Sequence, residues 1–220
     1  MDKKTNGMDL KDLRQNYDLD KLKKKDLNID PIHQFKLWMK EAVDGNCLEP
    51  NAMVLCTINE HQIPTSRVVL LKEVDENGRF VFYTNYESDK ARDIEMNNKV
   101  SLVFNWLPVH RQIRVEGIAT KVTKEVSEAY FQSRPRESQI GAYVSPQSAV
   151  IKNRKFLKNR MQEVEQKYKD LDKLPLPDNW GGYQIDPFMI EFWQGRESRL
   201  HDRFRFKMVE EEWQLDRLAP

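Results

Sequence analysis

The features that mark several large classes of protein are missing from this chain of 220 residues. Its two cysteines, Cys47 and Cys56, have neither metal-site spacing nor the pattern of a disulfide framework. We find no signal peptide and no apolar run long enough to cross a membrane. The formal net charge is only +1, whereas nucleic-acid-binding domains carry a clear basic excess. We therefore expect a cytoplasmic protein that binds no metal, no nucleic acid and no membrane.

The glycine-rich turns that commonly hold nucleotides are also absent. Neither Gly-x-Gly-x-x-Gly nor a Walker-type loop occurs anywhere in the sequence. A phosphate-bearing cofactor would therefore have to be held by side chains. Arginine and lysine residues at the ends of strands and helices become the main candidates, because their donors suit phosphate oxygens.

What the chain does contain is enough for one domain with an extension, since 39% of its residues are hydrophobic. Residues 1–29 are rich in lysine and aspartate with few apolar side chains, which predicts a mobile charged arm. Residues 30–220 are expected to form the folded domain. Asp30-Pro31 indicates a helix N-cap followed by proline at the first helical position, with the helix continuing to about Val43.

The hydrophobic period changes to two after Asn51, which predicts a mostly antiparallel sheet. Strands are expected at 52–58, 66–74, 79–84, 100–106, 111–122 and 180–185, in a hairpin over 189–208, and near 213–217. Helices are expected after Ser88, from Thr123 to about Ser133, and from Ser145. Because no regular βαβ alternation occurs, the pattern favours a mainly β fold with peripheral helices (α+β), arranged as a closed or nearly closed barrel.

In the stretch that begins at Arg199, nitrogen-donor and apolar side chains alternate. Nitrogen donors occupy the odd positions, as Arg199, His201, Arg203, Arg205 and Lys207, and apolar side chains the even ones, as Leu200, Phe204, Phe206 and Met208. Successive side chains of a strand point to opposite faces, so one face would be apolar and the other a row of donors. A half-buried strand with a solvated face gives the same pattern. Three arginines and a histidine in one row favour a binding site.

Two further segments place potential phosphate donors close together. The segment from Ser66 to Lys72 is an aliphatic strand with Arg67 and Lys72 near its ends, and two surface cations flanking a core strand would look the same. Being five apart, these cations should face opposite ways unless the strand bends. Tyr130, Arg134 and Ser138 recur every four residues, so they share one side of a helix or helical turn. An ordinary amphipathic helix end is the alternative interpretation.

These segments resemble motifs of the pyridoxamine 5'-phosphate oxidase family. Glu191-Phe192-Trp193-Gln194 followed by Arg199-Leu200-His201-Asp202-Arg203 resembles its C-terminal motif. The segments from Arg67 to Lys72 and from Tyr130 to Gly141 resemble two others, and the similarity spans about residues 30–220. The resemblance implies a split β-barrel of the FMN-binding type, with flavin mononucleotide (FMN) in the interface of a homodimer.

The same resemblance implies a role for individual residues. It implies FMN contacts from Arg67, Val68, Val69, Leu70, Leu71, Lys72, Tyr83, Thr84, Lys90, Gln112, Gln147, Ser148, Trp193 and Arg203. It implies substrate contacts from Lys72, Tyr130, Arg134, Ser138, Arg199 and His201, with Arg14 and Tyr17 in a segment that covers the substrate. Arg199 and His201 are the expected catalytic residues. Asp89 departs from the pattern, because family members often have a basic residue there.

The activity implied is the oxidation of pyridoxamine and pyridoxine 5'-phosphates to pyridoxal 5'-phosphate, a step of vitamin B6 metabolism. FMN and dioxygen would be used, and hydrogen peroxide released. Two alternatives stay open, because fold alone does not define function. A flavin reductase with a nicotinamide donor would not need the cluster of Tyr130, Arg134 and Ser138. A non-enzymatic carrier of flavin or pyridoxal phosphate would bind without turnover.

Overall fold

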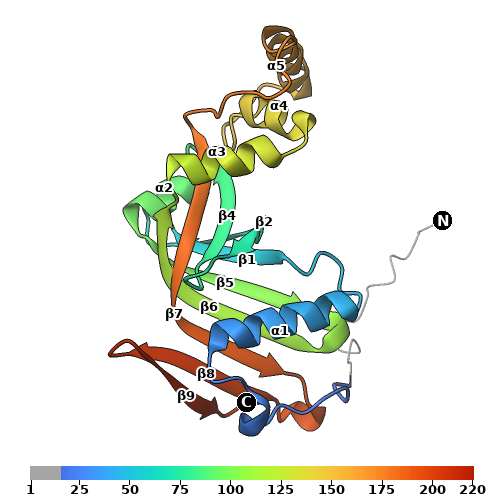
Figure 1. The fold of residues 1–220 in the computed structure, drawn as a ribbon, viewed down its shortest axis with the longest axis vertical. Helices are drawn as coiled ribbons and strands as arrows, with labels where there is room; N and C mark the ends of the chain where they lie inside the picture. Colours follow the sequence, from blue (N-terminus) through green and yellow to red (C-terminus); the bar gives the residue numbers. More distant parts are fainter. Residues whose placement is uncertain (1–15) are drawn as a thin grey trace, which may run out of the picture.

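The computed structural model describes residues 16–220, so the predicted substrate residue Arg14 lies outside the described part of the chain. Its strands form one antiparallel sheet in the order β2-β1-β5-β6-β7-β4-β3, and β8 and β9 continue from β7 (Figure 1). The strands are β1 (Ala52–Ile58), β2 (Pro64–Leu70), β3 (Glu73–Val74), β4 (Phe80–Asn85), β5 (Lys99–Trp106), β6 (Arg111–Lys121), β7 (Trp180–Gln194), β8 (Asp202–Val209) and β9 (Glu212–Leu218).

Strand β7 belongs to two parts of the sheet, because its two halves pair with different strands. The first part of this strand pairs with β4, as in Phe80 opposite Ile185, and the last part pairs with β8, as in Phe192 opposite Phe204. Between the two parts, the register with β6 shifts beside Gly117, and a β-bulge of this kind bends a strand. A Cβ on Gly117 would lie 2.5 Å from the Asp186 carbonyl oxygen, so only glycine allows this approach. The curled, divided sheet confirms the predicted mainly β architecture.

Five α-helices accompany the sheet within the described residues: α1 (Pro31–Asp44), α2 (Asp89–Met96), α3 (Lys124–Ser133), α4 (Arg136–Val144) and α5 (Arg154–Lys167). The helix predicted at Asp30-Pro31 is confirmed as α1, because the Asp30 carboxylate accepts a hydrogen bond from the Ile32 N–H. Helices α3 to α5 gather at one end of the molecule and β8–β9 at the other (Figure 1). No helix of residues 16–220 combines the length and apolar character needed to cross a membrane.

The described part of the chain contains two hydrophobic cores that hold these layers together. In the larger core, Phe35 of α1 packs against Phe80 and Phe104 of the sheet, with ring centroids 4.8 and 5.0 Å away. The smaller core lies under α3 and α4 and includes Phe131 and Trp180. Trp180 opens β7, so the strand that divides the sheet also connects the two cores.

The helix predicted to begin at Ser145 is wrong. Helix α4 ends at Val144, and α5 begins only after Asn153, whose side chain accepts from the Phe156 N–H and caps the helix. Val150, expected on a buried stripe, is fully exposed in the connecting loop. A better N-cap further along the chain decided where the helix begins.

The single strand predicted over 66–74 is divided into β2 and β3. Leu71 turns into the larger core, and its N–H donates to the Asn51 carbonyl. The Lys72 N–H then donates to the Val81 carbonyl, which places this residue beside β4. The chain therefore bends between Arg67 and Lys72. Because of this bend, the two side chains can face the same cleft although they are five residues apart.

The alternation predicted from Arg199 onward begins three residues later. Arg199 lies in a short 3-10 segment with a left-handed backbone (φ 61°), and Leu200 is exposed. From Asp202 the alternation holds, and Phe204 and Phe206 are buried. Close to this segment, Leu22 from the predicted N-terminal arm is buried, and its N–H donates to the Asp202 carboxylate at 3.2 Å.

Candidate active site

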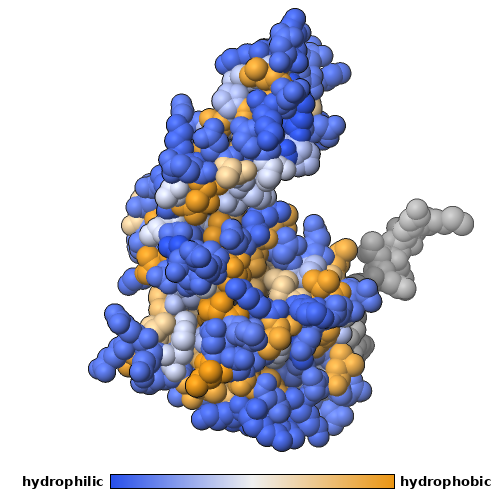
Figure 2. Space-filling model, in the orientation of Figure 1, coloured by the Kyte–Doolittle hydropathy of each residue, from blue (hydrophilic) through white to orange (hydrophobic). Residues whose placement is uncertain are grey.

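Most of the predicted site residues line one cleft of about 760 Å³, a volume typical of small-molecule sites. The predicted residues in its lining are Arg67, Val68, Val69, Leu70, Lys72, Tyr83, Thr84, Lys90, Tyr130, Arg134, Ser138, Gln147 and Ser148. Figure 2 shows the molecule hollowed on one side, between its helical end and the sheet. Leu71 is absent from the lining, because its side chain is in the core.

One end of the cleft contains a buried cation, Lys90. Lys90 is only 6% exposed, and its Nζ donates to Thr84 Oγ1 at 3.2 Å and to Ser88 Oγ at 3.0 Å. Burial, and next the nearby Arg67 guanidinium, lower the pKa of Lys90 to about 8. Since Lys90 forms no ion pair within residues 16–220, this end of the cleft is prepared for an anion.

The start of α2 and the loop after α4 complete this end. Ser88 occupies the predicted N-cap position, but its hydroxyl donates to the Asn85 carbonyl and does not cap the helix. Ser148 Oγ instead accepts the Asp89 N–H at 3.2 Å. Gln147 Oε1 accepts from Thr84 Oγ1 at 3.1 Å. The loop thus brings both predicted residues to the cleft without the helix that was expected to carry them.

The other end of the cleft has a second desolvated cation. The Arg134 guanidinium lies 4.6 Å from the centroid of the Trp180 ring, and burial lowers its pKa. Its Nη1 is buried and has no hydrogen-bond partner within the described residues. Tyr83 and Tyr130 stack beside it with centroids 3.8 Å apart. A buried donor without an acceptor marks a place where a ligand can supply one.

Trp180 is a lining residue that the sequence interpretation missed. A usable signal was the glycine pair that follows it. A Cβ on Gly182 would lie 2.8 Å from the Tyr83 ring, so the missing side chain leaves room for the aromatic stack. Trp180 stacks on Tyr83 in turn, with centroids 5.6 Å apart.

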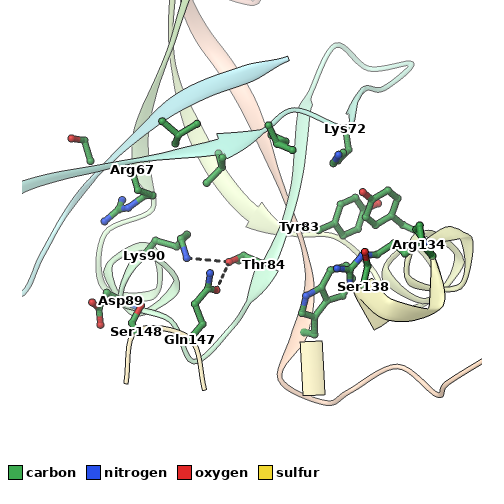
Figure 3. Close-up of a pocket in the computed structure, with 17 residues that line it drawn as sticks. Arg67, Lys72, Tyr83, Thr84, Asp89, Lys90, Arg134, Ser138, Gln147 and Ser148 are labelled. Carbon is green, nitrogen blue, oxygen red and sulfur yellow. Dashed lines mark hydrogen bonds between the residues drawn. The ribbon is translucent and has the colours of Figure 1, made fainter. Parts of the chain in front are cut away.

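The donor set fits a ligand system with two separated anionic groups. Figure 3 shows Arg67, Lys90, Gln147 and Ser148 on one side of the view and Lys72, Tyr83, Arg134 and Ser138 on the other. The phosphate of FMN suits the first group, because buried cations and hydroxyls bind phosphate oxygens well. The second group would remain for the phosphate of another molecule.

The remaining predicted residues lie elsewhere in the same chain. Trp193, His201 and Tyr17 form an aromatic cluster, with 4.6 Å between the Trp193 and His201 centroids and 5.7 Å between Tyr17 and His201. Gln112 lies opposite Trp193 in the β6–β7 register. None of them lines the cleft that contains Lys90 and Arg134. A single chain therefore carries the predicted site in two separate parts.

His201 is held in one orientation by the backbone. Its Nδ1 accepts the Arg196 N–H at 3.1 Å, so the neutral ring carries its proton on Nε2. Burial, and next the neighbouring Arg199, lower the pKa of His201, which favours this neutral form. Arg203 is fixed by a bond from its Nε to Glu191 at 2.7 Å, and Arg199 is exposed.

Solved structures with the same architecture define the class of protein. The crystal structure of PhzG from Burkholderia lata 383, in complex with tetrahydrophenazine-1-carboxylic acid, matches with a TM-score of 0.85 and 26% identity, covering 92% of this chain and 99% of that one. A pyridoxamine 5'-phosphate oxidase-related, FMN-binding protein from Nostoc punctiforme PCC 73102 shares the fold at a TM-score of 0.68 and 15% identity, covering 88% and 100%. The chain is thus a split β-barrel protein.

Sequence comparison gives the particular family. Residues 39–168 match the model described as pyridoxamine 5'-phosphate oxidase, and residues 180–220 match the pyridoxine 5'-phosphate oxidase C-terminal dimerisation region. The pyridoxine/pyridoxamine 5'-phosphate oxidase of Vibrio cholerae serotype O1 (strain M66-2) is 48% identical over 97% of this chain and all of that protein. That of Rippkaea orientalis (strain PCC 8801 / RF-1) is 47% identical with the same coverage. The chain belongs to the pyridoxine/pyridoxamine 5'-phosphate oxidase family, and its dimerisation region indicates a homodimer.

Proposed function

We propose that this protein oxidises pyridoxamine 5'-phosphate and pyridoxine 5'-phosphate to pyridoxal 5'-phosphate, using FMN and dioxygen and releasing hydrogen peroxide. The observation that carries the proposal is a desolvated cation at each end of one cleft, Lys90 and Arg134, neither of which has an acid partner among residues 16–220. Two phosphates in one site require two such ends. A carrier of flavin alone would need only the first.

Arg67 and Lys90 would hold the FMN phosphate, assisted by Ser148, whose hydroxyl accepts the Asp89 N–H at the start of α2. A phosphate dianion next to Lys90 would raise the pKa of its ammonium, because it supplies the countercharge that the buried group lacks. When bound, FMN supplies the redox chemistry by accepting a hydride equivalent from the substrate and passing electrons to dioxygen. The protein contributes binding and orientation.

Arg134, Lys72, Tyr130 and Ser138 would bind the substrate phosphate. Hydrogen bonds to charged groups contribute about 1.5 to 3 kcal/mol each before ordering costs, so a set of this size supports micromolar recognition of a phosphate ester. Arg134 needs little reorganisation, because the Trp180 ring already supports its guanidinium. The unphosphorylated vitamers would lack this contribution.

The second part of the site would be completed across the homodimer. We propose that FMN lies in the interface, where Gln112, Trp193 and Arg203 of one subunit reach the cleft of the other. Arg199 and His201 would position the substrate ring over the flavin, with Tyr17 covering it. Because Nδ1 of His201 is already an acceptor for the backbone, only its Nε2–H remains to donate to the substrate.

Anaerobic titration of the purified holoenzyme tests the activity. Adding pyridoxamine 5'-phosphate should bleach the flavin absorbance, and admitting air should restore it with release of hydrogen peroxide. Pyridoxamine without its phosphate is the matched control and should act much more weakly. Bleaching by a nicotinamide donor alone would favour a flavin reductase, and binding without any bleaching would favour a carrier.

A further inference from the structure

The guanidinium of Arg67 is held from behind by two threonines on neighbouring strands. Its Nη1 donates to Thr57 Oγ1 at 2.6 Å, and its Nη2 donates to Thr65 Oγ1 at 2.9 Å. Thr57 is almost completely buried. The Nε–H of Arg67 has no partner within residues 16–220, so it is available to a ligand in the cleft that this residue lines.

Both threonine hydroxyls converge on a single carboxylate. Asp93 Oδ2 accepts from Thr57 Oγ1 at 2.6 Å and from Thr65 Oγ1 at 2.9 Å, and it lies 3.5 Å from Arg67 Nη2. Asp93 is only 5% exposed and does not line the cleft. An ionised carboxylate can only accept, so each hydroxyl directs its proton toward Asp93 and its lone pairs toward Arg67. The carboxylate thereby sets the direction of the whole network.

Asp93 also links Arg67 to α2, the helix that carries Lys90. It lies on α2 one turn after Lys90, while Thr57 and Thr65 lie on β1 and β2 beside Arg67. We propose that Asp93, acting through Thr57 and Thr65, is a positioning residue. It orients the Arg67 guanidinium and fixes its position relative to Lys90, so that both can bind the FMN phosphate. This inference rests on the proposed FMN site and extends it to three residues that do not bind the cofactor themselves.

Two opposing effects decide what removal of the Asp93 charge does. A carboxylate near a phosphate dianion repels it, so simple electrostatics predicts that Asp93→Asn tightens FMN binding. The positioning role predicts the opposite, because an amide can donate as well as accept and no longer imposes one direction on both hydroxyls. Thr57→Val separates the effects, since it removes a hydroxyl and leaves the charge unchanged.

The test is a titration of the apoprotein with FMN and with riboflavin, which has the same ring system without the phosphate. The ratio of the two dissociation constants measures the contribution of the phosphate alone. We expect Asp93→Asn and Thr57→Val each to lower the preference for FMN by about tenfold, the lower end of the range for one hydrogen bond to a charged group, with riboflavin affinity changed by less than about twofold. Thr57→Ser should retain the preference, because it keeps the hydroxyl.

Asp75→Asn is the matched control, because Asp75 pairs with Arg79 at 2.8 Å in the β3–β4 hairpin outside the cleft. It should leave the preference for FMN unchanged. Equal loss of FMN and riboflavin affinity in Asp93→Asn and Thr57→Val, or an increased preference for FMN in Asp93→Asn, would overturn the positioning role. A wild-type protein without preference for FMN over riboflavin would instead contradict the proposed phosphate site itself.

Discussion

The cleft and the C-terminal strands are both rich in cations, but they use the charges differently. In the cleft, Lys90 donates to two hydroxyls, and the Arg134 guanidinium lies over the Trp180 ring. In the C-terminal strands, Arg203 pairs with Glu191 at 2.7 Å and Arg205 pairs with Asp216 at 2.8 Å. A cation with an acid partner fixes local geometry, whereas a desolvated cation without one attracts an anionic ligand. This contrast supports our proposal that Lys90 and Arg134 bind phosphates in the cleft, whereas the acid-paired arginines of the C-terminal strands are fixed within their own chain.

The largest effect is expected inside the C-terminal strands, where Phe204 is buried in the larger core. Phe204→Ala should lower the free energy of unfolding by about 3 to 5 kcal/mol, because the ring is fully buried and its loss leaves a cavity. Lys207→Ala on the exposed face of the same strand should cost about 0.5 kcal/mol or less. Chemical denaturation of both variants measures this. Similar losses in the two would contradict the assignment of the faces.

The next effect concerns the substrate end of the cleft. Arg134→Leu should raise the KM for pyridoxamine 5'-phosphate by about one to two orders of magnitude, with flavin content unchanged, because it removes a charged hydrogen bond. Arg136→Leu is the control, since Arg136 donates to the Tyr168 carbonyl outside the cleft. Steady-state kinetics and flavin absorbance give both quantities. Loss of flavin in parallel with the rise in KM would show that Arg134 contributes to FMN binding, which contradicts its assignment to the substrate phosphate.

A smaller effect is expected on the pH dependence of FMN affinity, through Lys90. The pKa of Lys90 in the apoprotein is lowered to about 8, and a bound phosphate dianion should raise it. FMN binding then takes up a proton between these two pKa values, so affinity should fall as pH rises, by about fivefold between pH 8 and 9.

Riboflavin affinity should not change over this range, and Lys90→Arg should remove the dependence on pH, because a guanidinium stays charged. Titrations of apoprotein at several pH values measure these dissociation constants. An FMN affinity that is constant from pH 7 to 9 in the wild type would show that the Lys90 charge does not contribute.

The smallest effect is expected at Asp89. Its carboxylate is exposed and pairs with Arg92, yet it lies in the first turn of α2 and lines the cleft. Asp89→Arg should tighten FMN binding by about two- to fourfold at low salt and less at high salt, because screening weakens the interaction. Glu163→Arg adds the same charge on α5 and should have no such effect. Weaker FMN binding by Asp89→Arg at low salt would show that this helix terminus does not hold the phosphate.

The sequence by itself determined the helix caps and turns, because these depend on short local patterns of residues. Asp30-Pro31 predicted α1, Asn77-Gly78 predicted the turn between β3 and β4, and Thr123 predicted the cap of α3. These predictions succeeded because a cap or a turn depends on a few neighbouring residues. The motifs around Arg67, Arg134 and His201 likewise indicated the family, since unusual residue types recur there at fixed spacing.

Only the tertiary structure decided where those residues meet. Arg67 and Lys72 line one cleft because Leu71 is drawn into the core, and Gln147 reaches Thr84 from a loop that was predicted as helix. Asp93 and Trp180 gained their roles through contacts with residues far away in the sequence. Such contacts depend on how the sheet curls around β7, and the local spacing of residues in the sequence does not specify which distant segments meet.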